Sequence, residues 1–272
     1  MLEFSPKSII HFNEITPDWL QQYENYNLTK CKRTKTTVAV YLRSLKAVFN
    51  KAIREKDIPS EIYPFGRDRY QIPAAIGVKK ALSMQQLNTL YHAKPCTPEQ
   101  EKAKDFWFFS FACNGMNIKD IALLKHENLT PDTLTYYRAK TINNPNIRPI
   151  VIHINNISRA IIRKYGTGKK YVFPIFNAEM NEFEKHRCIK NFTRVLNQGI
   201  KKLAIANDLP GEISTYWARH SFATVAINKG MSMEFVSEAL SHSNIKTTQG
   251  YFAGFESKTK KEFSDKLAKW LE

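Results

Sequence analysis

The 272-residue chain has few cysteines, and they are not spaced for a zinc site or a dense disulfide framework. Cys31, Cys96, Cys113 and Cys188 are far apart and form no C-x-x-C pair, which favours a reduced protein. Glycine (10 residues) and proline (12 residues) are also scarce, which excludes a collagen-like or linker-like chain. No apolar run approaches the roughly 20 residues that span a bilayer, since the longest, 106–113, has about eight. These absences argue against a membrane protein.

Positive charge is abundant. The chain has 41 Lys and Arg against 25 Asp and Glu, a formal net charge of +16 at pH 7. This surplus is spread along the sequence and is not confined to a tail. It favours a polyanionic partner, with nucleic acid ahead of an anionic membrane surface. Hydrophobic residues make up 43% of the chain, enough to build buried cores.

The first 75 residues are typical of a small helical domain with a basic exterior. Trp19, Leu20 and Tyr23 recur at helical spacing, and apolar residues do so again over 38–53. The segment 59–80 contains three prolines and has no helical period, so we interpret it as an extended, basic interdomain linker. The sequence therefore predicts two domains, at about 1–75 and 80–272.

The second domain is predicted to be mostly helical with one β-hairpin. Ser83 and Gln86 form a capping-box pattern that marks a helix start. Residues 133–140 and 147–154 are rich in β-formers and are separated by a turn at 143–146, which predicts two antiparallel strands. Further helices are expected at about 105–113, 118–124, 156–165, 190–207, 219–229, 234–241 and 257–271. The predicted fold class is mainly α with a small antiparallel β-sheet.

Three segments of this domain together resemble the tyrosine recombinase (phage integrase) family. Arg138-Ala-Lys140-Thr matches the family's R-x-K-T strand, and Arg219-His-Ser-Phe-Ala-Thr matches its R-H-[ST]-x-A-T segment. Leu240-Ser-His242, followed by Thr247 or Thr248 and by Tyr251, matches L-G-H-x-x-x-x-T-x-x-Y. The nine-residue step from His242 to Tyr251 is the family's spacing. The resemblance covers roughly residues 83–255.

The resemblance implies a two-domain, C-shaped clamp around double-stranded DNA, with 1–75 as the core-binding domain of SAM-like fold. It also implies DNA cleavage without metal or cofactor. Tyr251 would be the nucleophile and would form a 3′-phosphotyrosyl intermediate. Arg219 would hold the scissile phosphate through its fork of N–H donors, His242 would donate to that phosphate, and Lys140 would protonate the departing 5′ oxygen.

Two positions depart from the family pattern. The family's first arginine follows a glycine, but Gly115 is followed by Met and then by the neutral Asn117, a pattern that resembles a subgroup of mobile-element integrases. Lys119 or Arg148 is a candidate for the missing cation. The His of H-x-x-R is replaced by Tyr216, which can still donate a hydrogen bond but is a poor base near neutral pH. Both Asn117 and Tyr216 are retained as candidate site residues.

DNA contacts and partners follow from the same resemblance. The candidate DNA-binding residues are Lys35, Arg43, Lys46, Lys119 and Arg138. The last helix has an apolar stripe, and in recombinases such a helix commonly docks on a neighbouring protomer, which predicts a tetramer on DNA with room for accessory DNA-bending proteins. No signal-peptide pattern opens the sequence, so we expect a cytoplasmic protein at the bacterial nucleoid.

Two alternatives stay open at the level of sequence. One is a monomeric, topoisomerase-like enzyme with the same chemistry, and the other is a DNA-binding protein of the same fold that has lost catalysis. The target DNA sequence, the biological outcome (integration, excision, inversion or resolution) and the presence of an N-terminal arm-binding domain are not set by these patterns.

Overall fold

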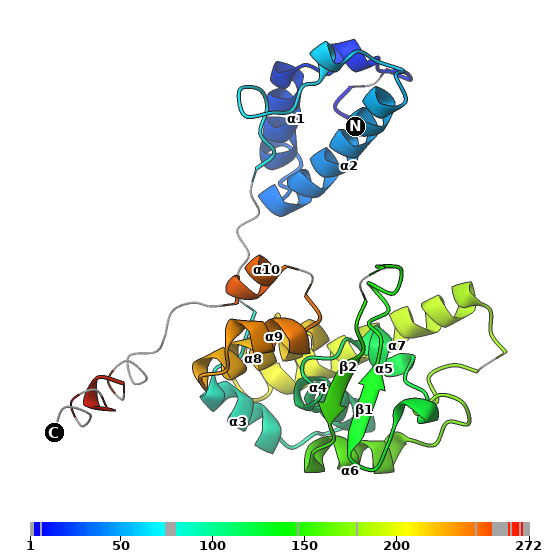
Figure 1. Ribbon diagram of the computed structural model, residues 1–272, viewed down its shortest axis with the longest axis vertical. Helices are drawn as coiled ribbons and strands as arrows, with labels where there is room; N and C mark the ends of the chain where they lie inside the picture. The colour runs from blue at the N-terminus through cyan, green and yellow to red at the C-terminus, as the bar shows by residue number, and fades with distance from the viewer. Residues whose placement is uncertain are drawn as a thin grey trace. The chain divides into compact units, whose positions relative to one another are not determined.

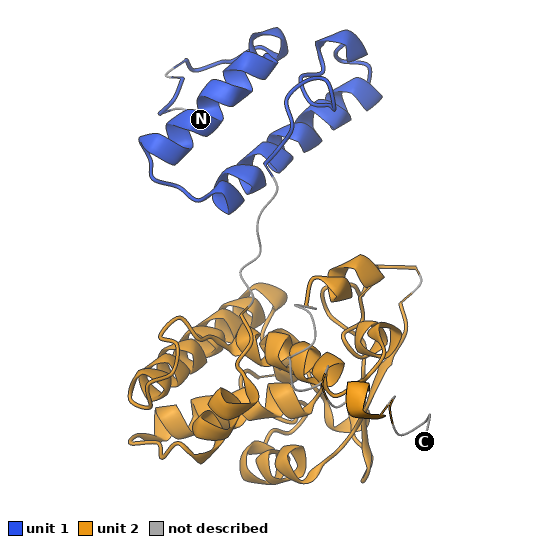
Figure 2. Cartoon of the chain, turned by 90° about the vertical axis from the view of Figure 1, so that its left-hand side faces the viewer, with its two compact units in different colours: residues 1–78 blue, residues 79–272 orange. Residues whose placement is uncertain are grey.

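The computed structural model describes residues 3–5, 7–73, 80–145, 147–177, 179–242 and 244–251, together with 261, 263–266 and 268. The chain divides into two compact units, Met1–Val78 and Lys79–Glu272 (Figure 2). Each unit contains its own cluster of buried apolar side chains. No helix in the described part of the chain is long and apolar enough to cross a membrane.

The first unit is built on two helices, α1 (Pro17–Thr29) and α2 (Lys35–Arg54), with short 3-10 turns η1 (Phe12–Glu14) and η2 (Ser60–Ile62). Each long helix starts at a threonine whose hydroxyl accepts a backbone N–H bond, Thr16 for α1 and Thr34 for α2. The helices pack through Leu20, Tyr23, Leu42 and Phe49, which are buried. The helical spacing predicted for this region is confirmed.

The predicted extended linker is wrong for its first half. Phe65 and Tyr70 are buried in the first unit, and the Phe65 ring lies 5.9 Å from that of Phe49. The Tyr70 hydroxyl donates to the Glu24 carboxylate at 2.5 Å. The prolines of this segment prevent a helix, but its aromatic side chains still gain by leaving water. Residues 74–79 lie outside the described residues.

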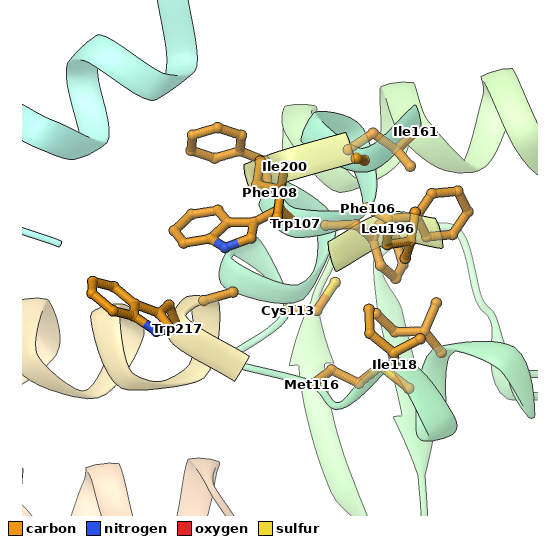
Figure 3. Packing of buried hydrophobic residues seen from close by; sticks show 14 of the residues in the cluster. Phe106, Trp107, Phe108, Cys113, Met116, Ile118, Ile161, Leu196, Ile200 and Trp217 are labelled. Atoms are coloured by element: carbon orange, nitrogen blue, oxygen red, sulfur yellow. The ribbon is translucent and has the colours of Figure 1, made fainter. Parts of the chain in front are cut away.

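The second unit is mainly helical (Figure 1). Its helices are α3 (Met84–His92), α4 (Pro98–Ala112), α5 (Ile118–Ala122), α6 (Asn156–Tyr165), α7 (Glu182–Ile205), α8 (Thr215–Asn228), α9 (Met233–Ala239) and α10 (Ile245–Gln249), with a 3-10 turn η3 (His126–Asn128). Helix α4 packs against α3, α6, α7 and α8. Phe106, Trp107, Phe108 and Phe109 are therefore all buried. In Figure 3 the ring of Phe106 points away from those of Trp107 and Phe108. This burial explains the longest apolar run of the sequence.

One hairpin forms the sheet of this unit, with β1 (Thr133–Tyr136) antiparallel to β2 (Ile150–His153). Leu134 faces Ile152 and Tyr136 faces Ile150, and all four side chains are buried. The predicted fold class is thus confirmed, but both strands are shorter than predicted.

The strands end early for local reasons. After Tyr136 the chain leaves the ladder, because the N–H of Ala139 donates to the Asp120 carboxylate at 2.9 Å and that of Thr141 to the Arg138 carbonyl at 3.0 Å. On the other strand Pro149 has no N–H to contribute, so pairing begins at Ile150.

Several helix bounds differ from the prediction. Helix α7 begins at Glu182 instead of 190, because Asn181 and Glu184 form a capping box ahead of it. Helix α4 begins at Pro98 instead of 105, since Thr97 caps it and proline is favoured in the first turn. Of the predicted helix 257–271, the residues 261, 263–266 and 268 are helical, and the rest lies outside the described residues.

Candidate functional site

Arg219 lies at the centre of the candidate site. It projects from α8 and is only 2% exposed, in a helix whose neighbouring side chains Trp217 and Ala218 are also buried. Its Nη1 donates to the Gly115 carbonyl at 3.1 Å, and its Nη2 donates to the Leu240 carbonyl. A buried guanidinium with two backbone acceptors is held in one orientation, which suits a group that binds a planar or tetrahedral anion.

The turn before α5 is shaped to admit this arginine. Gly115 has a φ of +69°, and a Cβ at this position would lie 2.8 Å from the Cα of Arg219. Asn114 also has a positive φ of 54°. Glycine is therefore required at 115 for two reasons, its backbone conformation and the close approach of α8. The turn is followed by Asn117, which directly precedes α5.

His242 connects Arg219 with the segment that carries Tyr251. Its Nε2 lies 3.3 Å from Nη2 of Arg219, and its Nδ1 lies 2.9 Å from the Thr248 hydroxyl. Because the guanidinium can only donate, Nε2 is the acceptor and we place the ring proton on Nδ1. Burial, followed by the charges of Arg219, Arg138 and Lys140, lowers the pKa of His242 to about 4. The imidazole is therefore neutral at pH 7 in the free protein.

The same contact decides between the two threonines of the motif. Thr248 is fully buried and holds His242, whereas Thr247 is exposed. Ser241, which stands where the family motif has glycine, has a φ of 49° and thus occupies the left-handed region that glycine favours.

Tyr251 follows α10 and is 8% exposed. Its ring is stacked on that of His242 with centroids 5.9 Å apart, and it lies 4.9 Å from the ring of His220. Burial and the neighbouring Tyr216 raise the pKa of the Tyr251 phenol, while Arg219 acts in the opposite direction. The phenol is thus protonated at rest and stands beside a buried cation.

Tyr216 and His220 occupy adjacent turns of α8. Tyr216 is 47% exposed, and its ring meets that of His220 edge-on with centroids 4.7 Å apart. Burial lowers the pKa of His220, as does the charge of Arg219. His220 therefore packs as a neutral ring between Tyr216 and Tyr251.

A cavity of about 520 Å³ opens beside Arg219. Asn117, Lys119, Arg138, Lys140 and Tyr216 line it together with Arg219, so it brings together most of the residues chosen from the sequence. Asn117 precedes α5, and its side chain makes no capping bond to that helix. Lys140 is exposed, four residues beyond the end of β1. His242 lines a separate cavity of about 440 Å³ together with Arg148.

Arg138, one of the candidate DNA-binding residues, is buried. It is 8% exposed, and its Nη1 donates to the carbonyls of Ser241 at 3.2 Å and Leu240 at 3.4 Å. Arg138 lies two residues beyond β1, where the alternation of the strand continues: Leu134, Tyr136 and Arg138 are buried, and Tyr137 is exposed.

The other predicted DNA-binding residues lie on helical surfaces. Lys35 and Arg43 are exposed on α2, and Lys46 is half-buried, with its Nζ 5.8 Å from the centroid of the Phe65 ring. Lys119 is exposed on α5. The three residues of α2 belong to the first unit and Lys119 to the second.

Sequence reasoning missed two features. Asp120 is buried in the site, and burial raises the pKa of its carboxyl. Helix α7 carries a basic stripe, defined here as His186, Lys190, Arg194 and Lys201, which lines a groove of about 760 Å³ with Lys119. The i, i+4, i+8 spacing of the first three residues was a visible signal for this stripe.

Among the described residues, no group of three or more His, Cys, Asp or Glu side chains is placed to hold a metal ion.

Comparison with known proteins identifies the family. Residues 1–72 match the phage integrase SAM-like domain, and residues 80–258 match the phage integrase family. The chain therefore belongs to the phage integrase family. Its two matches meet close to the division between the two units.

Curated relatives are tyrosine recombinases. The chain is 34% identical over 90 residues to tyrosine recombinase XerC of Pediococcus pentosaceus, a match to 33% of this chain and 27% of that protein. It is 25% identical over 180 residues to XerC of a Roseiflexus species, across 63% of this chain and 54% of the relative. In these two cases the match spans about half of the relative or less. XerC of Natranaerobius thermophilus is 24% identical over 259 residues, covering 89% and 80% of the two chains.

Solved structures share the fold. The Tn1549 transposon integrase in complex with transposon right end DNA has a TM-score of 0.67 at 16% identity, covering 98% of this chain and 90% of that one. The XerH site-specific recombinase bound to palindromic difH substrate has a TM-score of 0.66 at 15% identity, with 99% and 76% covered.

Proposed function

We propose that the chain is a site-specific DNA recombinase that cuts and rejoins DNA through a 3′-phosphotyrosyl intermediate at Tyr251. The observation that carries this proposal is the contiguous group Tyr251–His242–Arg219, in which a phenol, a neutral imidazole and a buried guanidinium lie against one another. Family membership supports the same chemistry. No cofactor takes part in the proposed steps.

The proposed reaction is a transesterification. The Tyr251 oxygen attacks the scissile phosphorus and its phenol proton leaves to water, so a Tyr–phosphate bond forms as the bond to the 5′ oxygen breaks. Lys140, beside the cavity, gives a proton to that 5′ oxygen. Arg219 holds the non-bridging oxygens, on which negative charge grows in the transition state. Religation reverses each transfer, and the phosphotyrosyl bond conserves the energy of the broken one.

Asn117 and Tyr216 complete the phosphate pocket as neutral hydrogen-bond donors. Both line the cavity with Arg219. At rest the raised pKa of Tyr251 keeps the nucleophile protonated. A phosphate beside His242 would supply the negative charge that favours an imidazolium, so that His242 gains a second proton and donates to the substrate.

Double-stranded DNA is the proposed partner. The +16 charge supplies the long-range attraction, and Lys35, Arg43 and Lys46 of the first unit and Lys119 with the basic stripe of the second unit are the proposed phosphate contacts. A C-shaped clamp, with a domain of 1–75 joined to one of 80–272, remains our proposal for how both units engage one duplex.

Assembly is proposed to involve four protomers, linked through the C-terminal helix 257–271. Within its described part Phe263 is 57% exposed, as expected for a side chain available to a neighbour. Accessory DNA-bending proteins and action at the bacterial nucleoid complete the proposal.

The experiment that tests this function uses nicked suicide duplexes drawn from a genomic or random pool, incubated with the full chain in the presence of a chelator. The protein attached to a 3′ end is isolated and the attached DNA is sequenced. We expect covalent adducts with a common sequence, and none with Tyr251→Phe, which retains the ring stacking on His242 but lacks the nucleophile.

Each other outcome favours a different function. Sequence-specific DNA binding without any adduct would support the catalytically degenerate DNA-binding protein. Adducts and relaxation of supercoils by a protein that remains monomeric on DNA would support the topoisomerase-like enzyme. Adducts that persist with Tyr251→Phe would assign the nucleophile to another residue.

A further inference from the structure

The site contains two buried guanidinium groups. Arg138 lies two residues beyond β1 and Arg219 lies on α8, and the Nη atoms of both donate to the carbonyl of Leu240. The two cations therefore converge on one backbone oxygen. Like charges in such proximity repel each other, and after burial itself the charge of Arg138 is the largest factor that lowers the pKa of Arg219.

Neither guanidinium is fully partnered. Among the described residues no carboxylate forms an ion pair with Arg138 or Arg219, and the Nε atoms of both are buried without a hydrogen-bond partner. The nearby Asp120 uses its Oδ1 to accept the Ala139 N–H, and its pKa is raised. Buried cations without a counter-ion are costly and are rare in folded proteins, and both residues line one cavity, so their uncompensated charge indicates a site for an anion.

The residues that line the cavity indicate where this anion would bind. Arg138, Arg219 and Asn117 line the same space of about 520 Å³, and Asn117 is neutral. We propose that Arg138 and Arg219 together bind the scissile phosphate, so that Arg138 supplies from the hairpin the second guanidinium that the Gly-x-Asn turn before α5 lacks.

The other two candidates for this cation fit less well. Lys119 lines the cavity but is exposed on α5 and presents a single ammonium group without a fork. Arg148 is exposed and lines the separate cavity that contains His242. Arg138 alone among the three is buried, with its orientation fixed by two carbonyls.

A first test needs no DNA sequence and does not depend on the proposed function. Thermal unfolding of the full chain is followed in inorganic phosphate and in chloride at equal ionic strength. We expect phosphate to raise the Tm of the wild-type chain and of Arg148→Met, and to raise it much less for Arg138→Met. An equal phosphate shift in Arg138→Met, or no shift in the wild-type chain, would overturn the inference.

A second test rests on the proposed function and uses the suicide duplex recovered by adduct sequencing. Loss of one donor to a developing charge typically reduces the rate about 10²- to 10³-fold, and we expect this loss in cleavage by Arg138→Met with Arg148→Met unaffected. A duplex with an uncharged methylphosphonate at the scissile position then distinguishes loss of the Arg138 charge from misfolding of the variant. It should restore cleavage by Arg138→Met towards the wild-type rate, which a misfolded variant cannot show.

The outcomes distinguish the two proposals. Cleavage at the wild-type rate by Arg138→Met, or a defect that persists on the methylphosphonate duplex, would overturn the role of Arg138 and leave the recombinase function intact. Absence of adducts with the wild-type chain would overturn the function, and the phosphate experiment would still decide whether Arg138 binds the anion.

Discussion

Gly115 and Arg219 approach each other so closely that a Cβ added to Gly115 would lie 2.8 Å from the Arg219 Cα and 2.9 Å from its Cγ. This contact couples the turn that carries Asn117 to the helix that carries the central cation. With a side chain at position 115, either α8 would have to move or the turn would have to adopt another conformation.

Gly115→Ala should therefore destabilise the fold and reduce cleavage. The positive φ alone costs about 1 kcal/mol for a residue with a Cβ, and the clash with α8 adds to it. Gly230→Ala is the matched control, because Gly230 has a φ of +87° but no atom within 4 Å of its added Cβ. Urea unfolding of both variants measures the difference, and equal losses of stability would show that the close approach has no energetic weight.

Ser241→Gly should stabilise the protein. Ser241 has a φ of 49°, so glycine would relieve a strain of about 1 kcal/mol immediately before His242. Ser237→Gly within α9 serves as the comparison, since glycine in a helix interior costs about 1 kcal/mol. Chemical unfolding is the measurement, and a loss of stability in both variants would contradict the prediction.

The titration of His242 should appear in the pH dependence of stability. Its pKa is about 4 in the folded protein against an ordinary value near 6.5, so the unfolded chain binds more protons between these values. Stability should therefore fall as the pH decreases from about 6.5 towards 4. The contribution is on the order of 1 kcal/mol at pH 5, below the full value of the shift because the ring is half-exposed to solvent.

His242→Gln removes this titration and should lose less stability than the wild-type chain over the same pH interval. His220 remains in both proteins, so its own lowered pKa cancels in the comparison. Identical slopes in the two proteins would assign the acid sensitivity to other groups.

The basic stripe on α7 should contribute to DNA affinity in a salt-dependent way. Each phosphate contact that is removed lowers the slope of log K against log salt by about 0.9. We expect Lys190→Gln and Lys201→Gln each to reduce that slope, in binding measured by fluorescence anisotropy. Lys102→Gln loses the same charge but lies at a different cavity, beside Phe192. An equal effect from Lys102→Gln would attribute the change to net charge alone.

Much of the fold follows from patterns visible in the sequence. The Ser83–Gln86 capping box starts α3 as predicted, and the alternating apolar residues of 133–136 and 150–153 form the expected hairpin. Such local signals involve residues that contact each other within one or two turns, so they can be recognised without tertiary information.

The sequence-based predictions are wrong where contacts between residues far apart in the sequence determine the local structure. The segment containing Phe65 has no helical period, and only its packing on Phe49 shows that it belongs to the first unit. The predicted strand 133–140 ends early because Asp120, from another element, takes the Ala139 N–H.

In the candidate site, too, some residues were predicted from motifs and others depend on the three-dimensional surroundings. The motif predicted Arg219, His242 and Tyr251, and the structure places their side chains together. The burial of Arg138 was present in the predicted strand 133–140 as its alternation with Leu134 and Tyr136, but the sequence analysis did not use this signal. Its unpartnered Nε is a property of three-dimensional surroundings that no spacing reveals.

The carbonyl of Leu240 accepts N–H donors from both Arg138 and Arg219, and it ends the helix that leads to His242 and Tyr251. The residue at the end of α9 is thus tied to both the hairpin and α8. The start of the segment that carries the nucleophile is therefore positioned by the same two cations that line the cavity.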